Sequence, residues 1–365
     1  MDNQRITKLR TEAGQKGLDC VALVPGANLF YLTGLSFHLS ERPVLALFPV
    51  DDAPAIVLPA LEAPKLEHAA CALHPFPYTD EEGPALAFQQ ACASLELADA
   101  RIGAEHLHMR LLEARYLERY APGCELSPAD DVMSALRMTK DAGELAAMRE
   151  AVAVIEAALQ ATLDRLEPGM REREVAGTLM IEIFDKGGDG LAFEPIVVAG
   201  PNAASPHSGP SDRPIGRGET IVIDCGATVD GYASDITRTV AIGEMPEAMQ
   251  RVYRTVLDAN TAGRAAARPG VTAEAVDQAA RAVIEAAGYG AYFIHRTGHG
   301  LGLETHEPPY IVAGNRRVLE EGMTFTVEPG IYLPGLGGVR IEDDVVVTAA
   351  GAESLTTFPR ELTVL

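Results

Sequence analysis

The chain has 365 residues, which favours two domains over one, because single domains usually have about 100–200 residues. Thirty Lys and Arg stand against 52 Asp and Glu, giving a formal net charge of −22. Such an acidic chain is repelled by phosphate backbones and anionic lipids, so nucleic-acid and membrane partners are disfavoured. The sequence has no apolar run of bilayer-spanning length and no signal-peptide core near its N-terminus. Its five cysteines form no CxxC pair, which favours reduced thiols in a cytoplasmic protein.

The first part of the chain alternates strand and helix patterns. Apolar runs predict strands at 20–25, 44–50 and 55–59, and helical spacings are found at 6–16, 60–68, 84–95 and 109–120. The YLTGL stretch at 31–35 also resembles a strand. This alternation predicts an α/β domain. Prolines and a glycine at 121–131 break the pattern, so we expect one domain at 1–126, a linker at 127–138 and a second domain at 139–365.

A long amphipathic helix is predicted at the start of the second domain. Its apolar residues recur at spacings of three and four: Leu145, Met148, Val152, Ile155, Leu159, Leu163 and Leu166. Asp141 and Glu144 form a cap-like start, and Pro168-Gly169 ends the helix.

An internal repeat follows this helix. Pro168-Gly169, Val175 and Gly187 recur 101 residues later as Pro269-Gly270, Val276 and Gly288. Each copy shows a long helix, a Pro-Gly break, a second helix and then strand patterns. A duplicated α+β unit packs its helices on one face of a shared sheet and leaves a cleft on the other.

The strand-rich part of this domain places acidic residues on the face opposite its apolar residues. A hairpin is predicted for 220–228 and 232–242 around an Asp-Gly turn, with further strands at 323–328 and 339–348. Alternation puts Asp224, Asp235, Glu328 and Glu342 on the non-apolar faces of these strands. One acidic residue per strand is typical of a solvated sheet. Four strands with the same pattern favour a bound divalent cation, because clustered buried carboxylates repel each other.

Three histidines lie close together in the motif HRTGHGLGLETHEPP, at His295, His299 and His306. The glycines on both sides of His299 suit a tight backbone close to a site. The motif does not follow the GxGxxG or GK[ST] patterns that bind phosphates.

Four motifs, IDCGATVDGYASDITRT, HRTGHGLGLETHEPP, TVEPG and VRIED, occur in this order and resemble those of the two-metal pita-bread peptidases. The similarity is greatest to the Xaa-Pro branch, prolidase and aminopeptidase P, and extends from Asp141 to about Leu365. The N-terminal part is more loosely similar to the creatinase-type domain, through its length, its α/β pattern and NLFYLTG at 28–34. The resemblance implies an α/β N-terminal domain and an α+β pita-bread catalytic domain with an internal pseudo-two-fold repeat.

By this resemblance, two divalent ions are bound by Asp224, Asp235, His299, Glu328 and Glu342. Four carboxylates would balance the four positive charges of two divalent ions, and Mn²⁺ fits these ligands best, with Co²⁺ or Zn²⁺ as alternatives. The resemblance implies attack by a metal-bridging hydroxide on the bond before proline, with Glu328 as proton carrier. By the same resemblance, His207 matches the histidine that hydrogen-bonds the scissile region, and His306 the one that stabilises the gem-diolate oxygen or its neighbours. His295 and Arg340 match positions beside the proline and its carboxylate.

The substrate is therefore expected to be a small peptide with proline after the scissile bond. We favour a dipeptide, since an arginine reads a terminal carboxylate well; Arg340 and, more speculatively, Arg42 are the candidates. Aminopeptidase P activity on longer peptides is the alternative, and a metal-free binding protein on this fold is a lesser one. The intact ligand set argues against the metal-free creatine amidinohydrolase, and the N-terminal domain against methionine aminopeptidase. Relatives of this architecture imply a homodimer.

Overall fold

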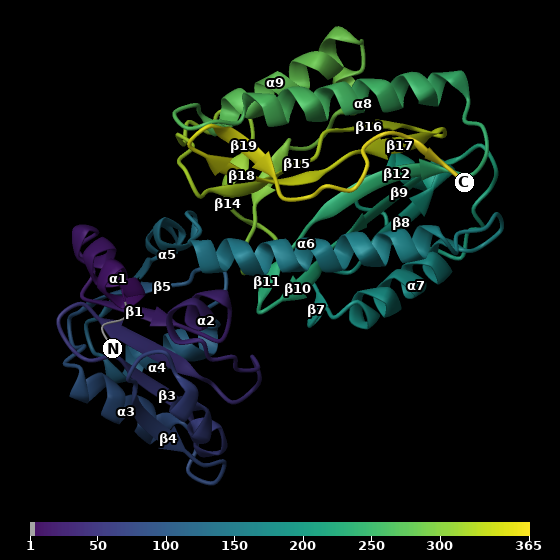
Figure 1. Ribbon diagram of the computed structural model, residues 1–365. Coiled ribbons are helices and arrows are strands. Elements are labelled where there is room, and N and C mark those ends of the chain that lie inside the picture. The colour runs from purple at the N-terminus through teal and green to yellow at the C-terminus, as the bar shows by residue number, and fades with distance from the viewer. Residues whose placement is uncertain (1–3) are drawn as a thin grey trace. The chain divides into compact units, whose positions relative to one another are not determined.

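A computed structural model describes residues 4–365 and divides the chain after Arg137 into two compact units (Figure 1). The first unit holds a six-stranded mixed sheet in the order β4-β3-β2-β1-β5-β6. Its strands are β1 (Cys20–Leu23), β2 (Leu45–Pro49), β3 (Ala55–Pro59), β4 (His74–Tyr78), β5 (Arg101–Ala104) and β6 (Glu125–Pro128). Its helices are α1 (Gln4–Gln15), α2 (Ala27–Thr33), η1 (Ala60–His68), α3 (Ala85–Ser94), α4 (Leu111–Tyr120) and α5 (Asp130–Arg137).

The predicted α/β character of this unit is confirmed, and two kinds of element differ from expectation. The strand expected at 31–35 is wrong, because residues 27–33 form helix α2, which ends at Gly34 in the left-handed region with φ 70°. The structure adds β4, β5 and β6, which were not expected; β4 and β6 form the two edges of the sheet and contain prolines. Edge strands tolerate proline because one side of their backbone has no strand partner, and the prolines hide the strand pattern in the sequence.

The second unit contains four long helices and two main sheets. The helices are α6 (Ala142–Leu163), α7 (Glu172–Asp185), α8 (Glu247–Ala266) and α9 (Ala273–Ala286). The four-stranded sheet, β20-β12-β9-β8, consists of β8 (Ile196–Ala199), β9 (Thr220–Cys225), β12 (Ile236–Ala241) and β20 (Thr363–Val364). The five-stranded sheet, β14-β13-β15-β18-β19, consists of β13 (Gly298–Gly300), β14 (Glu307–Ile311), β15 (Thr324–Val327), β18 (Asp343–Thr348) and β19 (Gly351–Ser354).

Shorter elements complete this unit. They are the strands β7 (Gly190–Leu191), β10 (Ala227–Val229), β11 (Tyr232–Ala233), β16 (Gly330–Leu333) and β17 (Gly337–Arg340), and the 3₁₀ turns η2 (Gly200–Ala204) and η3 (Gly290–Tyr292). The capping box predicted at Asp141 and Glu144 starts α6. Among residues 4–365, none of the helices combines the length and apolar character that a membrane span requires.

The internal repeat is a structural repeat. The backbone N–H of Gly169 donates to Ile215, and that of Gly270, 101 residues later, donates to Leu319, each over 2.9 Å. Both glycines have positive φ, at 90° and 85°. In Figure 1 the two main sheets of this unit lie between α8 and α9 on one side and α6 and α7 on the other. The predicted pseudo-two-fold architecture is thereby confirmed.

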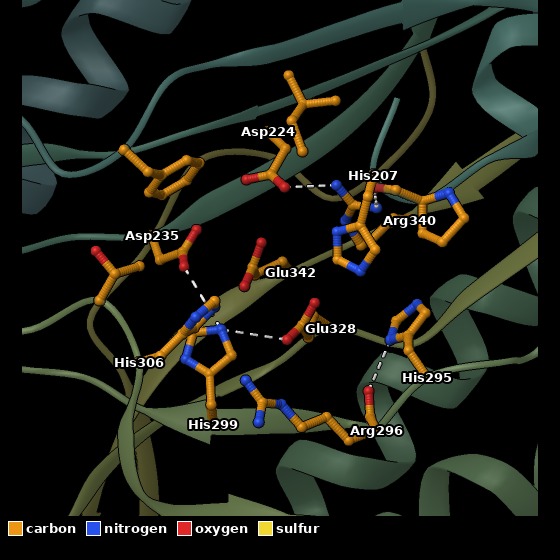
Figure 2. A pocket seen from close by; sticks show the side chains of 14 residues that line it. His207, Asp224, Asp235, His295, Arg296, His299, His306, Glu328, Arg340 and Glu342 are labelled. Atoms are coloured by element: carbon orange, nitrogen blue, oxygen red, sulfur yellow. Dashed lines mark hydrogen bonds and ion pairs between the residues drawn. The ribbon is translucent and has the colours of Figure 1, made fainter. Parts of the chain in front are cut away.

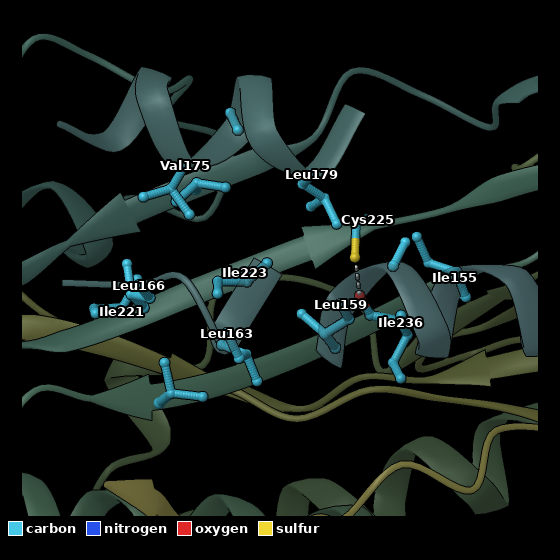
Figure 3. Close-up of a cluster of buried hydrophobic side chains, with 14 of the residues drawn as sticks. Ile155, Leu159, Leu163, Leu166, Val175, Leu179, Ile221, Ile223, Cys225 and Ile236 are labelled. Carbon is cyan, nitrogen blue, oxygen red and sulfur yellow. Dashed lines mark hydrogen bonds between the residues drawn. The ribbon is translucent and has the colours of Figure 1, made fainter. Parts of the chain in front are cut away.

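Each helix pair buries its apolar stripe on the sheets. Figure 3 shows Ile155, Leu159 and Leu163 of α6 against residues of β9 and β12, in a cluster of fully or nearly fully buried side chains. The second pair packs in the same way, with Val252 and Val256 of α8 in a cluster with Val339 and Ile341. These two cores leave the polar faces of the strands to form the site.

The Asp-Gly hairpin is present, with Asp230 and Gly231 at φ 51° and 82° between β10 and β11. The single strand expected at 339–348 is wrong. The chain leaves β17 after Arg340, passes through Ile341 and Glu342, and enters β18 at Asp343. The first strand pairs with β16 and the second with β15, so the backbone changes partner strand at this point.

Candidate active site

One cavity of about 470 Å³ in the second unit collects nearly all of the predicted site residues (Figure 2). Nine of the ten line it: His207, Asp224, Asp235, His295, His299, His306, Glu328, Arg340 and Glu342. Phe193, Ile196, Pro206, Arg296 and Thr305 complete the lining. The tenth residue, Arg42, belongs to the first unit. There its Nε and one terminal nitrogen each donate to Asp80 over 2.7 Å, in a bidentate pair.

The acidic residues come from both copies of the repeat. Asp224 lies in β9, Asp235 precedes β12, and Glu328 follows β15 directly. In the antiparallel pair of β9 and β12, Asp224 is opposite Thr237, whose hydroxyl donates to Glu342 over 2.6 Å. Strand alternation therefore directs these side chains away from the apolar cores and into one pocket.

The glycine before His299 allows the backbones of two strands to approach closely. A Cβ at Gly298 would lie 1.8 Å from the carbonyl oxygen of Thr326, so no other residue fits without displacing β13 or β15. His299 then lies between these carboxylates, with its backbone N–H donating to the Thr326 hydroxyl over 3.1 Å. This close approach is the physical reason for the glycine predicted beside the histidine.

His299 presents one ring nitrogen to the acidic residues. Its Nδ1 is 3.2 Å from the carbonyl oxygen of Gly300, which fixes the proton on that nitrogen. Its Nε2 lies 3.3 Å from Glu328 and 3.7 Å from Asp235. Ligand atoms of Asp235, His299 and Glu342 all lie within 4.8 Å of one another. An unprotonated Nε2 surrounded by carboxylate oxygens suits a cation.

The electrostatics of the pocket also fit a bound cation. Burial and the neighbouring carboxylates raise the pKa of Asp235 and Glu342 well above the usual range, and burial raises that of Glu328 to about 7. Burial lowers the pKa of His299 to about 3, so its imidazole is neutral. One oxygen of Asp224 and one of Asp235 are buried without a hydrogen-bond partner. Buried carboxylates with unsatisfied oxygens and a neutral imidazole form a divalent-metal donor set.

The guanidinium of Arg340 forms hydrogen bonds with neighbouring side chains of the protein. This buried guanidinium donates to Asp224, to the Thr237 hydroxyl over 3.1 Å and to the Tyr332 hydroxyl over 2.9 Å. The Tyr332 hydroxyl is also 2.8 Å from Nε2 of His295. Burial and the Arg340 charge lower the pKa of His295 to about 4, which keeps this imidazole neutral. Tyr332 is a site residue that no sequence pattern indicated.

His306 packs against His299, with ring centroids 4.1 Å apart in an edge-to-face contact. Burial lowers the pKa of His306, so it too is neutral near pH 7. His207 follows η2 in the first copy, and His306 precedes β14 in the second. The two histidines therefore reach the pocket from different halves of the repeat.

Sequence reasoning missed the residue that fixes the segment carrying His207. Glu172, fully buried at the start of α7, accepts hydrogen bonds from the backbone N–H groups of Ala199 and Ser211 over 2.8 and 3.0 Å. It also accepts from the Asn202 amide and the Ser211 hydroxyl. These contacts fasten both ends of the 199–211 segment to one carboxylate. An acidic residue in a first helical turn is too common to signal this role.

The fold and site together define a two-domain metallopeptidase. Residues 146–349 match Metallopeptidase family M24, and residues 5–139 match the Creatinase/Prolidase N-terminal domain. The chain belongs to family M24 and carries this N-terminal domain.

Known relatives match either nearly the whole chain or about two thirds of it. The probable dipeptidase PepE of Mycobacterium tuberculosis is 39% identical over 368 residues, which cover 99% of this chain and 96% of that protein. A Xaa-Pro dipeptidase of Pyrococcus furiosus is 44% identical over 238 residues, covering 65% of this chain and 68% of that one. The crystal structure of a Thermococcus sibiricus prolidase superposes with a TM-score of 0.95 at 36% identity, with all of both chains covered.

Proposed function

We propose that this protein hydrolyses the peptide bond before proline in Xaa-Pro dipeptides, with two divalent ions in the pocket. The observation that carries the proposal is the convergence of Asp224, Asp235, His299, Glu328 and Glu342 on one cavity. These five residues would hold the ions, which supply Lewis-acid polarisation of the carbonyl and activation of water. Mn²⁺ is the proposed metal, with Co²⁺ and Zn²⁺ as alternatives, because the donors are mostly carboxylate oxygens.

The protein's own groups supply the proton chemistry and orientation. Glu328, which lines the cavity beside His299, accepts and returns the proton. His207 and His306 approach from opposite copies of the repeat and donate hydrogen bonds to the oxygen and nitrogen of the scissile bond. His295, held by Tyr332, lies beside the proline. Arg340 contributes by fixing Asp224, which fits its observed partners better than direct substrate binding.

Three further parts of the proposal rest on relatives and composition. The names of the relatives, dipeptidase and prolidase, favour dipeptides over longer peptides. We propose a homodimer and a cytoplasmic location for the protein. Arg42 is retained as a candidate cap that favours dipeptides. Its bidentate pair with Asp80 would have to open for this role, and an Arg42→Ala variant with an unchanged dipeptide-to-tripeptide kcat/KM ratio would exclude it.

The proposal is tested by metal content and activity together. Metal-stripped protein is titrated with Mn²⁺ while bound metal and Ala-Pro hydrolysis are measured. We expect two ions per chain, with activity appearing as they bind, and loss of both in Asp235→Asn. Glu321→Gln, which removes an exposed carboxylate of the same unit, is the matched control and should leave both unchanged. Full Ala-Pro hydrolysis by metal-stripped protein in EDTA would overturn the proposal.

A further inference from the structure

The cavity contains two arginines, and they differ in what they contact. Arg340 is 3% exposed, and its guanidinium donates hydrogen bonds to Asp224, Thr237 and Tyr332. Arg296 also lines the cavity, yet across residues 4–365 no protein acceptor receives a hydrogen bond or ion pair from its guanidinium. Its contact is with an aromatic face, since its Cζ lies 4.7 Å from the ring centroid of Tyr310. A guanidinium whose N–H groups have no hydrogen-bonded acceptor among the described residues is available to a ligand.

The backbone around Arg296 is held by hydrogen bonds, while its guanidinium forms none with the described residues. The neighbouring His295 carbonyl accepts from Arg281 over 2.9 Å, and the Thr297 backbone N–H donates to Ile311 over 3.0 Å. The carbonyl oxygen of Arg296 itself lies 2.7 Å from Nδ1 of His295. Figure 2 shows the side chain extending from this anchored backbone beneath Glu328 toward His299. The guanidinium thus lies among the proposed reacting groups, with its polar edge unclaimed.

We propose that Arg296 binds a carboxylate of the substrate and so sets the specificity of the pocket. The inference rests on the proposed function, because it names the group that an Xaa-Pro substrate presents there. A planar guanidinium binds a carboxylate through two parallel hydrogen bonds, and the contact with the Tyr310 ring helps to hold it in place. A dipeptide offers this group in two ways: as its C-terminal carboxylate, or as the side chain of an acidic residue before proline. Both are the same chemistry at one guanidinium.

A second role for Arg296 has to be separated by the experiment. Its positive charge also lowers the pKa of Glu328, opposing the effect of burial. Removing the charge could slow every substrate equally by changing the proton acceptor. If Arg296 binds a substrate carboxylate, its removal should instead lower kcat/KM only for substrates that carry that carboxylate.

The test compares matched substrates in the metal-loaded enzyme. Ala-Pro is paired with its amide Ala-Pro-NH₂, and Asp-Pro with Asn-Pro, so each pair differs by one carboxylate. In Arg296→Met, kcat/KM should fall about 10- to 100-fold more for the carboxylate member of at least one pair, as expected for a charge-assisted hydrogen bond. The affected pair identifies the source of the carboxylate. Arg296→Lys should restore part of the preference for the carboxylate member of the pair. Its ammonium group keeps the positive charge but cannot form the two parallel hydrogen bonds of a guanidinium.

Arg316→Met is the control, since Arg316 is an exposed arginine of the same unit outside the cavity. It should leave all four kcat/KM values unchanged. In Arg296→Met, an equal loss of kcat/KM for both members of both pairs, with a shifted pH profile, would overturn the proposal that Arg296 binds a substrate carboxylate. It would show instead that Arg296 acts through the pKa of Glu328. If the wild type cleaves none of these peptides, the proposed function fails, and calorimetry of proline against prolinamide then tests Arg296 separately. Equal wild-type binding of proline and prolinamide, together with equal binding of the uncleaved Asp-Pro and Asn-Pro, would overturn the inference.

Discussion

Arg340 and Asp224 form a buried ion pair inside the cavity, with the guanidinium bonded to one carboxylate oxygen while the other oxygen has no partner. The pair fixes which oxygen of Asp224 is presented to a cation. Arg340 also holds Thr237, whose hydroxyl bonds Glu342, so one guanidinium orients two of the five proposed ligands. Hydrogen bonds of this kind to metal ligands commonly govern metal affinity.

Replacing Arg340 should therefore weaken metal binding. In Arg340→Met, Mn²⁺ affinity should fall about 10- to 100-fold, with kcat falling too. Arg340→Lys should restore little, because an ammonium cannot reach all three partners in the same geometry. Calorimetric Mn²⁺ titration measures the effect, with the exposed Arg254→Met as control. Unchanged metal affinity with a raised KM would instead assign Arg340 to the substrate carboxylate.

Gly298 should tolerate no side chain. A Cβ there would meet the Thr326 carbonyl at 1.8 Å, so Gly298→Ala must push apart β13 and β15 and displace His299. We expect a loss of about 1–3 kcal/mol in the free energy of unfolding, together with weaker metal binding. Gly177→Ala is the matched control, because that helical glycine has open space around its Cβ position and should be neutral or stabilised. Native stability in Gly298→Ala, measured by urea unfolding, would contradict the geometry.

Stabilisation by metal should grow with pH. In the metal-free protein, the raised pKa values of Asp235, Glu342 and Glu328 mean that these carboxyls stabilise the fold below about pH 4. That contribution is lost as the pH rises through their folded pKa, about 7 for Glu328. His299, with its pKa lowered to about 3, is already neutral and adds no competing proton in this range.

A cation competes with those carboxyl protons, so the increase in Tm on adding Mn²⁺ should be small at pH 5 and larger at pH 8. Calorimetric scans with Mn²⁺ and with EDTA across this range measure the difference directly. A metal-dependent increase in Tm that stays constant between pH 5 and 8 would mean that the carboxylates are already ionised in the metal-free protein.

Glu172 should couple stability to activity. Glu172→Ala leaves the N–H groups of Ala199 and Ser211 without their acceptor, and we expect a loss of about 2–4 kcal/mol in unfolding free energy. Because the freed segment carries His207, kcat should also fall at a temperature where the variant is still folded. Asp185→Asn, an exposed acidic position in the same helix, is the control. Full stability of Glu172→Ala in urea unfolding would refute this role.

Sequence periodicity predicted which side chains lie on the same face of a strand, and the acidic residues assigned in this way are found in the cavity. Alternation assigned Asp224 and Glu328 to the non-apolar sides of their strands, and both line the cavity. The 101-residue offset predicted two similar halves, and the Gly169 and Gly270 backbone hydrogen bonds repeat with it. Such features depend on local backbone geometry, which the residue pattern encodes directly.

Side-chain contacts between segments far apart in the sequence could not be predicted from these patterns. No local pattern links Tyr332 with His295 or Glu172 with Ser211, because these contacts depend on how distant segments pack. The change of partner strand at Ile341 and Glu342 was missed for the same reason, since alternation continues across it and only the pairing differs. Arg296 was visible in the histidine motif, yet its lack of a protein acceptor is known only from the structure. The roles of the cavity residues stay predictions until tested.

The most direct test of the central claim is hydrolysis of Ala-Pro beside Ala-Pro-Ala by metal-stripped protein to which Mn²⁺ has been returned. We expect rapid cleavage of Ala-Pro, little cleavage of the tripeptide, and no cleavage of either before metal is added. Preference for Ala-Pro-Ala would contradict the dipeptidase assignment and indicate aminopeptidase P activity. Failure to cleave either peptide with any divalent ion would contradict the account as a whole.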